Sequence, residues 1–399
     1  MNLNILKIST KVAAKRHMKT ISNVLQRQLV ALLFAFVSSS AQAAPGVTGS
    51  SITLGQSIYL TGGLASLGND LTRGAGLYFD KVNAQGGVHG RKIILSTLDD
   101  AYVPDRAKEN AQTLLEKNRV FALFQFAGTG SIAVVAPYVE AQQVPLCAAV
   151  ATGPELRAQR FDNVFYVRAG NTQEINVIAR FMAITARKRV GVMYLAAPYG
   201  QQGRAVAVQA TKENNLIYAG DVEIAPGAAG EAAVNAALQL ARQKPDAVLL
   251  ITAGKTSVTA IKALQTAGFR NEQVFALAAA VGPGEIQALG SAATGLVVSQ
   301  VTPSPDSQSQ SDTNAFRQAA EKAGLQPSYT LFEGWLNAAV CTAALVNAGK
   351  SPTRSSFRKA LENLNIQTSS MQVAFDARKR DGSSFVELTF VKEGGKFAR

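Results

Sequence analysis

The sequence predicts an α/β protein with two lobes, each built around a doubly wound parallel sheet. Short apolar runs alternate with amphipathic helical stretches from Ser51 onward, which is the order typical of α/β proteins. The apolar runs are nearly continuous, as expected for parallel strands that helices cover on both faces. The chain has 399 residues, of which 47% are hydrophobic, and is therefore long enough to bury more than one core.

The first alternating unit starts with a strand expected at 52–58. The helix after it has apolar residues at helical spacing, and Gly86 and Gly87 are expected to end it. These apolar residues are Leu71, Ala75, Tyr78 and Val82. Pro104 and Ser131 are expected to open two further helices. Strands are expected between these helices at 92–98, 120–127 and 146–151.

The second alternating unit begins near Ala169, where Asn171 and Glu174 have the spacing of a capping box. Its strands are expected at 190–196, 222–225, 247–252 and 274–280. After the proline-containing segment 302–305, helices are expected around 316–323 and 328–348. The chain is expected to end in a hairpin formed by two strands, 371–375 and 385–391.

Residues 1–43 have the three parts of a secretory signal peptide. They contain six basic residues and no acidic residue, then the apolar run 29–37, then Ala41-Gln42-Ala43. The apolar run is too short to cross a bilayer, and no cysteine follows it that would carry a lipid anchor. We therefore expect export, with cleavage near Ala43, from a start at either Met1 or Met18.

The charge distribution argues against nucleic-acid binding. Without residues 1–43 the chain has 34 Lys+Arg against 27 Asp+Glu, so its formal net charge falls from +13 to +7. The basic residues are scattered, and no RNP pattern, basic helix or zinc finger accompanies them. The sequence after residue 43 contains no second long apolar run that would indicate insertion into a membrane. A mild positive field favours small anionic ligands.

Signatures of catalysis and of metal binding are lacking in the sequence. It has no G-x-S-x-G, H-E-x-x-H, Walker or G-x-G-x-x-G motif, and two cysteines with two histidines are too few for a multi-ligand metal centre. His89 is expected to be a solvated turn residue, and Asp99-Asp100 lacks a partner cluster. We expect no enzyme activity, no cofactor and no metal. Cys147 and Cys341 are expected to be buried free thiols, although export permits a disulfide.

Two polar turns follow strands of the first unit. Gly128-Thr129-Gly130-Ser131 precedes one helix, and Ala151-Thr152-Gly153-Pro154-Glu155 precedes another. Both turns are expected at the carboxyl edge of the sheet, where open α/β sheets bind ligands. Hydroxyl groups beside a helix N-terminus suit a ligand carboxylate, but Thr and Ser are also common helix caps. From these residues alone, binding and capping are equally good interpretations.

Several segments of the chain form a combined pattern that no single one of them would specify. They are Thr61-Gly62-Gly63-Leu64-Ala65-Ser66-Leu67-Gly68, Gly74, the stretch 82–91, Asp99-Asp100-Ala101, 151–156, Tyr199-Gly200-Gln201-Gln202-Gly203, 246–268, and Tyr329 ahead of the helix containing Trp335. Together they resemble the leucine/isoleucine/valine-binding protein family, the type I periplasmic solute-binding proteins of ABC transporters. The similarity covers essentially the whole chain after the signal segment.

The resemblance implies two lobes joined by three crossovers, with a ligand trapped between them by hinge closure. The crossovers are expected near 168–170, 300–303 and 375–377. The lobes are then expected to divide the chain as follows: 1–43 signal peptide, 44–168 with 302–374 as lobe 1, and 169–301 with 375–399 as lobe 2.

The resemblance also assigns ligand-binding positions. Thr129 and Thr152 match hydroxyl groups that hold the ligand carboxylate, and Val150 matches a backbone carbonyl position. Leu67 and Tyr199 match apolar or aromatic contacts. Pocket shape is also expected to depend on Tyr102, Gln125 and Tyr329, whereas Lys255 is expected to be a solvated loop lysine.

The sequence departs from the family pattern in the second lobe. The acid that holds the ligand ammonium falls at Ala278, with Glu285 as the acid if the alignment is displaced. The neighbouring aromatic position falls at Ala253 or Gly254. A buried ammonium without a carboxylate would lose several kcal/mol, so the departure favours a carboxylate ligand that lacks an α-amino group.

The expected function is that of the periplasmic substrate-binding component of a branched-chain amino-acid-type ABC transporter. It would capture a small carboxylate, an amino acid or a related compound, and deliver it to a membrane permease. The alternatives are a binder of an aromatic or keto carboxylate, and a ligand sensor acting with a separate receptor. We expect a periplasmic monomer.

Overall fold

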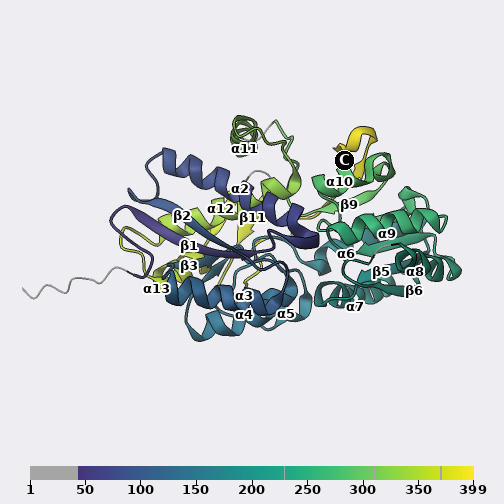
Figure 1. Ribbon diagram of the computed structural model, residues 1–399, viewed down its shortest axis with the longest axis horizontal. Coiled ribbons are helices and arrows are strands. Elements are labelled where there is room, and N and C mark those ends of the chain that lie inside the picture. Colours follow the sequence, from purple (N-terminus) through teal and green to yellow (C-terminus); the bar gives the residue numbers. More distant parts are fainter. Residues whose placement is uncertain (1–43, 229, 309–310, 369–370) are drawn as a thin grey trace, which may run out of the picture. The chain divides into compact units, whose positions relative to one another are not determined.

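The computed structural model describes residues 44–399 except 229, 309–310 and 369–370. The expected signal peptide and its cleavage site lie outside the described residues. Within the part that is described, no helix combines the length and the hydropathy needed to cross a bilayer. Helices and strands alternate along most of the chain (Figure 1), and the predicted α/β class is confirmed.

The first sheet has four parallel strands in the order β2-β1-β3-β4. Their bounds are β1 Ser51–Ile58, β2 Lys92–Asp99, β3 Ala122–Phe124 and β4 Leu146–Cys147. Hydrophobic side chains of β1 and β3, such as Leu54 and Phe124, are almost fully buried. Burial on both faces explains the unbroken apolar sequence of β3.

Helices cover both faces of this sheet (Figure 1). One face carries α2 (Ala65–Ala84, after the short η1 Gly62–Leu64) and α12 (Tyr329–Asn347), and the other carries α3 (Pro104–Gln112) and α4 (Thr129–Ala141). The remaining elements of this unit are η2 (Thr113–Lys117), α5 (Pro154–Ala158), α11 (Ser311–Lys322), α13 (Arg354–Glu362), β10 (Asn365–Thr368) and β11 (Met371–Ala374).

The second sheet has seven strands in the order β13-β12-β9-β8-β7-β5-β6. Strands β5 (Arg189–Leu195), β6 (Ile217–Ile224), β7 (Ala247–Ile251), β8 (Val274–Ala276) and β9 (Val297–Gln300) are parallel. Strands β12 (Glu387–Val391) and β13 (Phe397–Ala398) extend it antiparallel. Its helices are α6 (Asn171–Ile184), α7 (Pro198–Glu213), α8 (Glu231–Arg242), α9 (Lys255–Thr266) and α10 (Pro283–Leu289), with η3 (Asn271–Gln273), η4 (Gly290–Ala293) and η5 (Glu393–Gly395).

The chain passes between the two units three times: after β4, after β9 and after β11, where β10 and β11 form a separate two-stranded sheet in the first unit. The third passage stays in contact with the first unit as far as Phe385. Gly382 donates its backbone N–H to Tyr166, and Phe385 packs against the first core, so the chain reaches the second sheet only at Glu387. The lobe limits set out above stay a prediction.

The predicted terminal hairpin is wrong. Strand β11 pairs with β10 instead, and β12 pairs with β9 and β13. The reason is that residues 376–385 run back beside the first passage, where Asp381 forms a bridge with Tyr166. Strand propensity located the two strands, but it carried no information on their partners.

The prediction of free thiols is also wrong, because Cys147 and Cys341 form a disulfide. Their Cα atoms lie 6.1 Å apart although 194 positions separate them in sequence. Strand β4 carries Cys147 and helix α12 carries Cys341, and both side chains lie in the core of the first unit. Packing of the helix on the sheet brings them together, which neither local pattern indicates.

Candidate functional site

A cavity of about 60 Å³ lies where loops from the carboxyl ends of both sheets meet. Parallel strands place these loops at one edge, and such edges are where α/β sheets bind ligands. The wall includes eight of the residues that the sequence analysis named as candidates: Leu67, Tyr102, Thr129, Val150, Thr152, Tyr199, Ala253 and Ala278. It also includes Tyr59, Leu64, Leu71, Gly128, Arg168, Ala279, Thr330 and Glu333. The cavity brings these residues together, and their role as ligand contacts stays a prediction.

Thr129 is buried at the start of α4 with its hydroxyl oxygen already used as an acceptor. Its Oγ1 accepts the backbone N–H groups of Thr152 at 3.4 Å and of Gly153 at 3.3 Å. The hydroxyl proton therefore stays available to donate. Neither α4 nor α5 has a side-chain cap, since glycine occupies both N-cap positions. This geometry favours binding over capping for both threonines.

Gly128 allows the close approach that shapes this wall. Its φ of 107° lies in the region that favours glycine. A Cβ at this position would lie 2.8 Å from the Tyr102 ring. Asp100 holds the Tyr102 backbone by accepting its N–H at 2.9 Å, which fixes the loop after β2. The aspartate pair of the sequence analysis is therefore a loop support.

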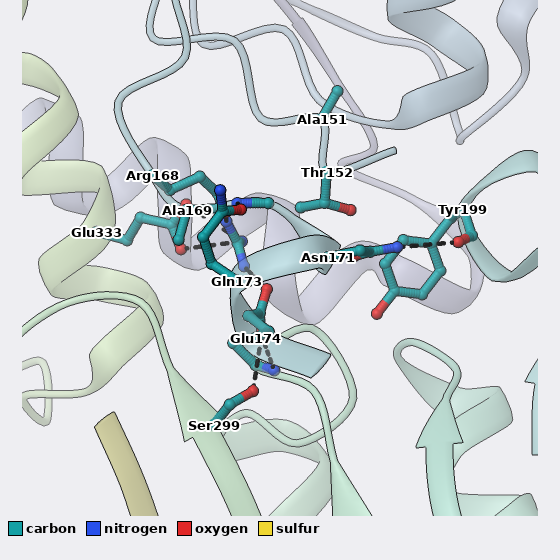
Figure 2. A network of polar contacts seen from close by, with 12 residues as sticks. Ala151, Thr152, Arg168, Ala169, Asn171, Gln173, Glu174, Tyr199, Ser299 and Glu333 are labelled. Atoms are coloured by element: carbon teal, nitrogen blue, oxygen red, sulfur yellow. Dashed lines mark hydrogen bonds and ion pairs between the residues drawn. The ribbon is translucent and has the colours of Figure 1, made fainter. Parts of the chain in front are cut away.

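A buried network of three charges lies beside the cavity (Figure 2). The Arg168 guanidinium lies between two carboxylates, at 2.9 Å from Glu174 and 3.4 Å from Glu333. Glu174 Oε2 accepts the Ala278 N–H at 2.9 Å and the Ser299 hydroxyl at 2.7 Å. Arg168 and Glu333 line the cavity. One cation between two carboxylates leaves the ionised cluster with an excess negative charge.

Burial and charge act together on the ionisable groups of this wall. Burial raises the pKa of Glu333, although the Arg168 cation works against this shift. Burial also raises the pKa of Tyr199 and of Tyr59, so both side chains remain neutral hydroxyl groups. The Tyr199 hydroxyl is buried and has no hydrogen-bond partner among the described residues. A buried hydroxyl without a partner is the kind of group that a ligand can satisfy.

Sequence analysis missed the role of Arg168, Glu174 and Glu333. It read Glu174 as part of a capping box, which is wrong: Gln173 accepts the Gly170 N–H instead, at 3.1 Å, and Glu174 pairs with Arg168. A usable signal existed, because Glu333 is the sole charged residue in the sequence of α12. A charge inside an apolar helix indicates a buried partner.

Four other candidates do not line the cavity. Gln125 accepts a hydrogen bond from Gln56 at 3.0 Å, and Tyr329 donates to Glu387 at 3.1 Å. Glu285 accepts the N–H of Gly282 at 3.0 Å within its own helical turn, and Lys255 opens α9. The described residues also hold no group of three or more His, Cys, Asp or Glu side chains that could bind a metal ion.

Comparisons with known proteins agree with this architecture. A family model described as "Periplasmic binding protein" matches residues 51–396. The "Leu/Ile/Val-binding protein homolog 3" of Brucella melitensis is 29% identical over 151 residues, which are 38% of this chain and 41% of that protein. The match therefore spans about two fifths of the length of this curated relative.

Solved structures are similar over nearly the whole chain. An extracellular ligand-binding receptor from Verminephrobacter eiseniae has a TM-score of 0.80 at 26% identity, covering 88% of this chain and 100% of its own. A solute-binding protein from R. palustris in complex with benzoate has a TM-score of 0.77 at 19% identity, covering 88% and 95%. The second likeness shows the fold alone.

Proposed function

Since the chain belongs to the periplasmic binding protein family and has its type I fold, we propose that it captures a small carboxylate and delivers it to the membrane permease of an ABC transporter. The observation that carries this proposal is the cavity wall. Thr129 and Thr152 offer hydroxyl groups from the first unit, and Tyr199 and Ala278 face them from the second. A ligand that touches both units stabilises the closed arrangement over the open one.

The proposed location and partners follow from the family. The protein would act in the periplasm as a monomer after cleavage near Ala43, and the permease would bind its closed, ligand-bound form. It would release its ligand chemically unchanged. A ligand sensor that acts with a separate receptor would bind its ligand in the same way. A pull-down with the ligand-bound, closed protein distinguishes the two roles, because a transport protein would capture a permease and a sensor would capture a receptor.

The charges beside the cavity favour an α-amino acid as the ligand. Glu333 lines the wall, and the two carboxylates of Glu333 and Glu174 carry one more charge than the Arg168 guanidinium. A ligand ammonium beside Glu333 would balance the excess negative charge. The acid missing at Ala278 is therefore not required for amino-acid binding. The relative from Brucella melitensis is named for leucine, isoleucine and valine.

A second candidate ligand is an aromatic or keto carboxylate without an amino group. The specific observation in its favour is the Ala278 position, where the second unit offers only a backbone N–H, and that group already donates to Glu174. With such a ligand, the Glu333 carboxyl group would be protonated, a form that its burial favours by raising its pKa.

A thermal-shift panel on protein that has been unfolded and refolded to remove co-purified ligand tests the function. The panel compares leucine, isoleucine, valine and phenylalanine with the matched keto acids and with benzoate. Ligand at a hundred times Kd should stabilise the fold by about 2.7 kcal/mol. No shift with any member of the panel would contradict carboxylate capture.

Glu333→Gln and Glu174→Gln form a matched pair for the ligand class. Both variants remove one negative charge beside Arg168, but Glu174 does not line the cavity. We expect Glu333→Gln to weaken an amino acid roughly 10- to 100-fold relative to its keto acid, since hydrogen bonds to charged groups contribute about 1.5–3 kcal/mol. Glu174→Gln should leave that ratio nearly unchanged. An unchanged ratio in Glu333→Gln would favour the second candidate.

A further inference from the structure

A larger chamber of about 500 Å³ adjoins the cavity. It shares three wall residues with the cavity: Leu64, Tyr102 and Ala253. Like the cavity, it lies at the carboxyl ends of strands, with walls from the loops after β2 and β5 and from the start of α4. The two spaces are therefore neighbouring compartments with a common wall.

The chamber differs from the cavity in chemistry. No charged side chain lines it, and most of its wall residues are leucine, proline, alanine or glycine. Its polar side chains are limited to the hydroxyl groups of Tyr102, Ser131 and Thr256, and the Thr256 oxygen accepts the Gly227 N–H at 3.0 Å. Leucine, proline and alanine side chains thus make up most of its surface, whereas the cavity contains Arg168 and Glu333.

Tyr102 is held at the boundary by strained backbone. Ala101 and Tyr102 both have positive φ, 49° and 64°, which is unusual for residues other than glycine. The Tyr102 ring packs edge-on against Tyr59 with centroids 5.6 Å apart. Strain of this kind costs of order 1–3 kcal/mol and persists where the surroundings enforce it, often at ligand sites.

We propose that the chamber holds the apolar tail of the ligand whose polar head lies in the cavity. The inference rests on the proposed function, and it names the ligand class as carboxylates with an extended aliphatic or aryl-aliphatic substituent. The cavity alone is small, and Leu64, Tyr102 and Ala253 line both spaces, so a substituent that outgrows the cavity can extend past these residues into the chamber. An apolar space next to a charged head-group site matches such an amphipathic molecule.

The test is a chain-length series on the wild-type protein. Straight-chain α-amino acids from alanine to 2-aminodecanoate and alkanoates from propanoate to decanoate are titrated by calorimetry. Each added methylene that enters the chamber should improve affinity about fourfold, the ratio that corresponds to burying one methylene. A flat dependence on length in both series would overturn the proposal.

Ala197→Phe locates the tail. Ala197 lines the chamber and not the cavity, and the phenyl ring would occupy chamber space. In Ala197→Phe, the gain in affinity with increasing chain length of the ligand should disappear. The shortest ligand that binds should keep its affinity within about threefold of the wild-type value. Ala205→Phe is the matched control, because Ala205 is exposed on helix α7, which Ala197 directly precedes, and lines neither space. A folded Ala197→Phe with an unchanged length series would place the tail elsewhere and overturn the proposal.

The series separates failure of carboxylate capture from failure of the tail site. If no member of either series binds at any length, carboxylate capture itself is wrong. If short members bind and length adds nothing, capture stands and the tail site is wrong. The wild-type series decides this without any variant.

Discussion

At the scale of single residues, the site depends on how each polar group is already engaged. Thr129 illustrates this, because its oxygen accepts two backbone N–H groups while its proton remains free. The hydroxyl is therefore oriented as a donor before any ligand arrives. Arg168 illustrates the opposite case, since two carboxylates already occupy its guanidinium.

Replacing Thr129 by valine keeps the shape of the side chain and removes the donor. A lost hydrogen bond to a ligand carboxylate should weaken binding roughly 10- to 100-fold, since hydrogen bonds to charged groups contribute about 1.5–3 kcal/mol. Calorimetric titration measures the loss. Thr266→Val is the control, because the exposed Thr266 hydroxyl bonds only within its own helix. Equal affinity in both variants would remove Thr129 from the site.

Asp99 gives a pH-dependent prediction. Burial works to raise its pKa, but hydrogen bonds from Thr61 and from the N–H groups of Ala101 and Leu60 outweigh this and lower it. Because the folded-state pKa lies below the unfolded one, the stability that Asp99 adds is present above the unfolded value and is lost as pH falls through the folded value. Asp99→Asn should cost about 1 kcal/mol at pH 7, after allowance for partial exposure.

Urea unfolding at neutral and at acid pH checks this prediction. The difference between wild type and Asp99→Asn should shrink as the pH is lowered towards the folded-state pKa. Asp80→Asn, at an exposed position of α2, should behave as wild type throughout. A deficit in Asp99→Asn that stays constant with pH would argue against a role of the charge.

At the scale of elements, the contact between α2 and α12 depends on two glycines. A Cβ on Gly74 would overlap the Leu331 carbonyl oxygen, and a Cβ on Gly334 would overlap that of Leu71. The two helix backbones therefore approach more closely than larger residues would permit. This contact positions Glu333, which lies beside Gly334 on α12.

Gly74→Ala and Gly76→Ala should shift stability in opposite directions. Gly74→Ala forces a backbone shift and should destabilise the fold by about 1–3 kcal/mol or more. Gly76 lies on the same helix with no atom near its virtual Cβ, so its replacement should stabilise the fold by about 0.5–1 kcal/mol through helix propensity. Denaturant unfolding measures both free energies. Stabilisation by Gly74→Ala would contradict the close packing.

The disulfide fastens α12 to the first sheet. Both cysteines are almost fully buried, so a reductant should not reach the bond in the folded protein. Replacement of both cysteines by alanine should lower the free energy of unfolding by about 2–4 kcal/mol, since the loop that the bond closes in the unfolded chain is long. Thermal unfolding with and without reductant tests this. An identical melting temperature for the double variant and the oxidised wild type would contradict it.

At the scale of the whole molecule, binding should change the distance between the two sheets. Both units contribute to the cavity wall, and three passages connect them. The first and third passages are joined by the Arg157–Asp381 ion pair at 2.7 Å and by the Tyr166 backbone bonds. These contacts favour rotation about a compact hinge over separation of the units.

Small-angle X-ray scattering of the refolded, ligand-free protein should give a larger radius of gyration than the same protein with saturating ligand. Thr129→Val at the same ligand concentration should stay near the ligand-free value until saturation is restored by more ligand. Identical scattering with and without ligand, where calorimetry shows binding, would exclude closure.

The alternation of strands and helices, the two-unit architecture and the polar turns around Thr129 and Thr152 could all be predicted from the amino-acid sequence. These features are local, because hydrophobic periodicity and turn residues act over a few positions. The family resemblance also assigned Leu67, Tyr199 and Ala278 to a single ligand-binding site. Their shared cavity agrees with that expectation, although contact with a ligand stays a prediction.

The partners of distant residues could be identified only from the three-dimensional structure. It paired Cys147 with Cys341, moved the last strands into different sheets, and enclosed Arg168 between two carboxylates. Each of these contacts joins positions far apart in the chain or depends on which groups share a buried space. Such contacts follow from the packing of whole elements, on which a local sequence pattern carries no information.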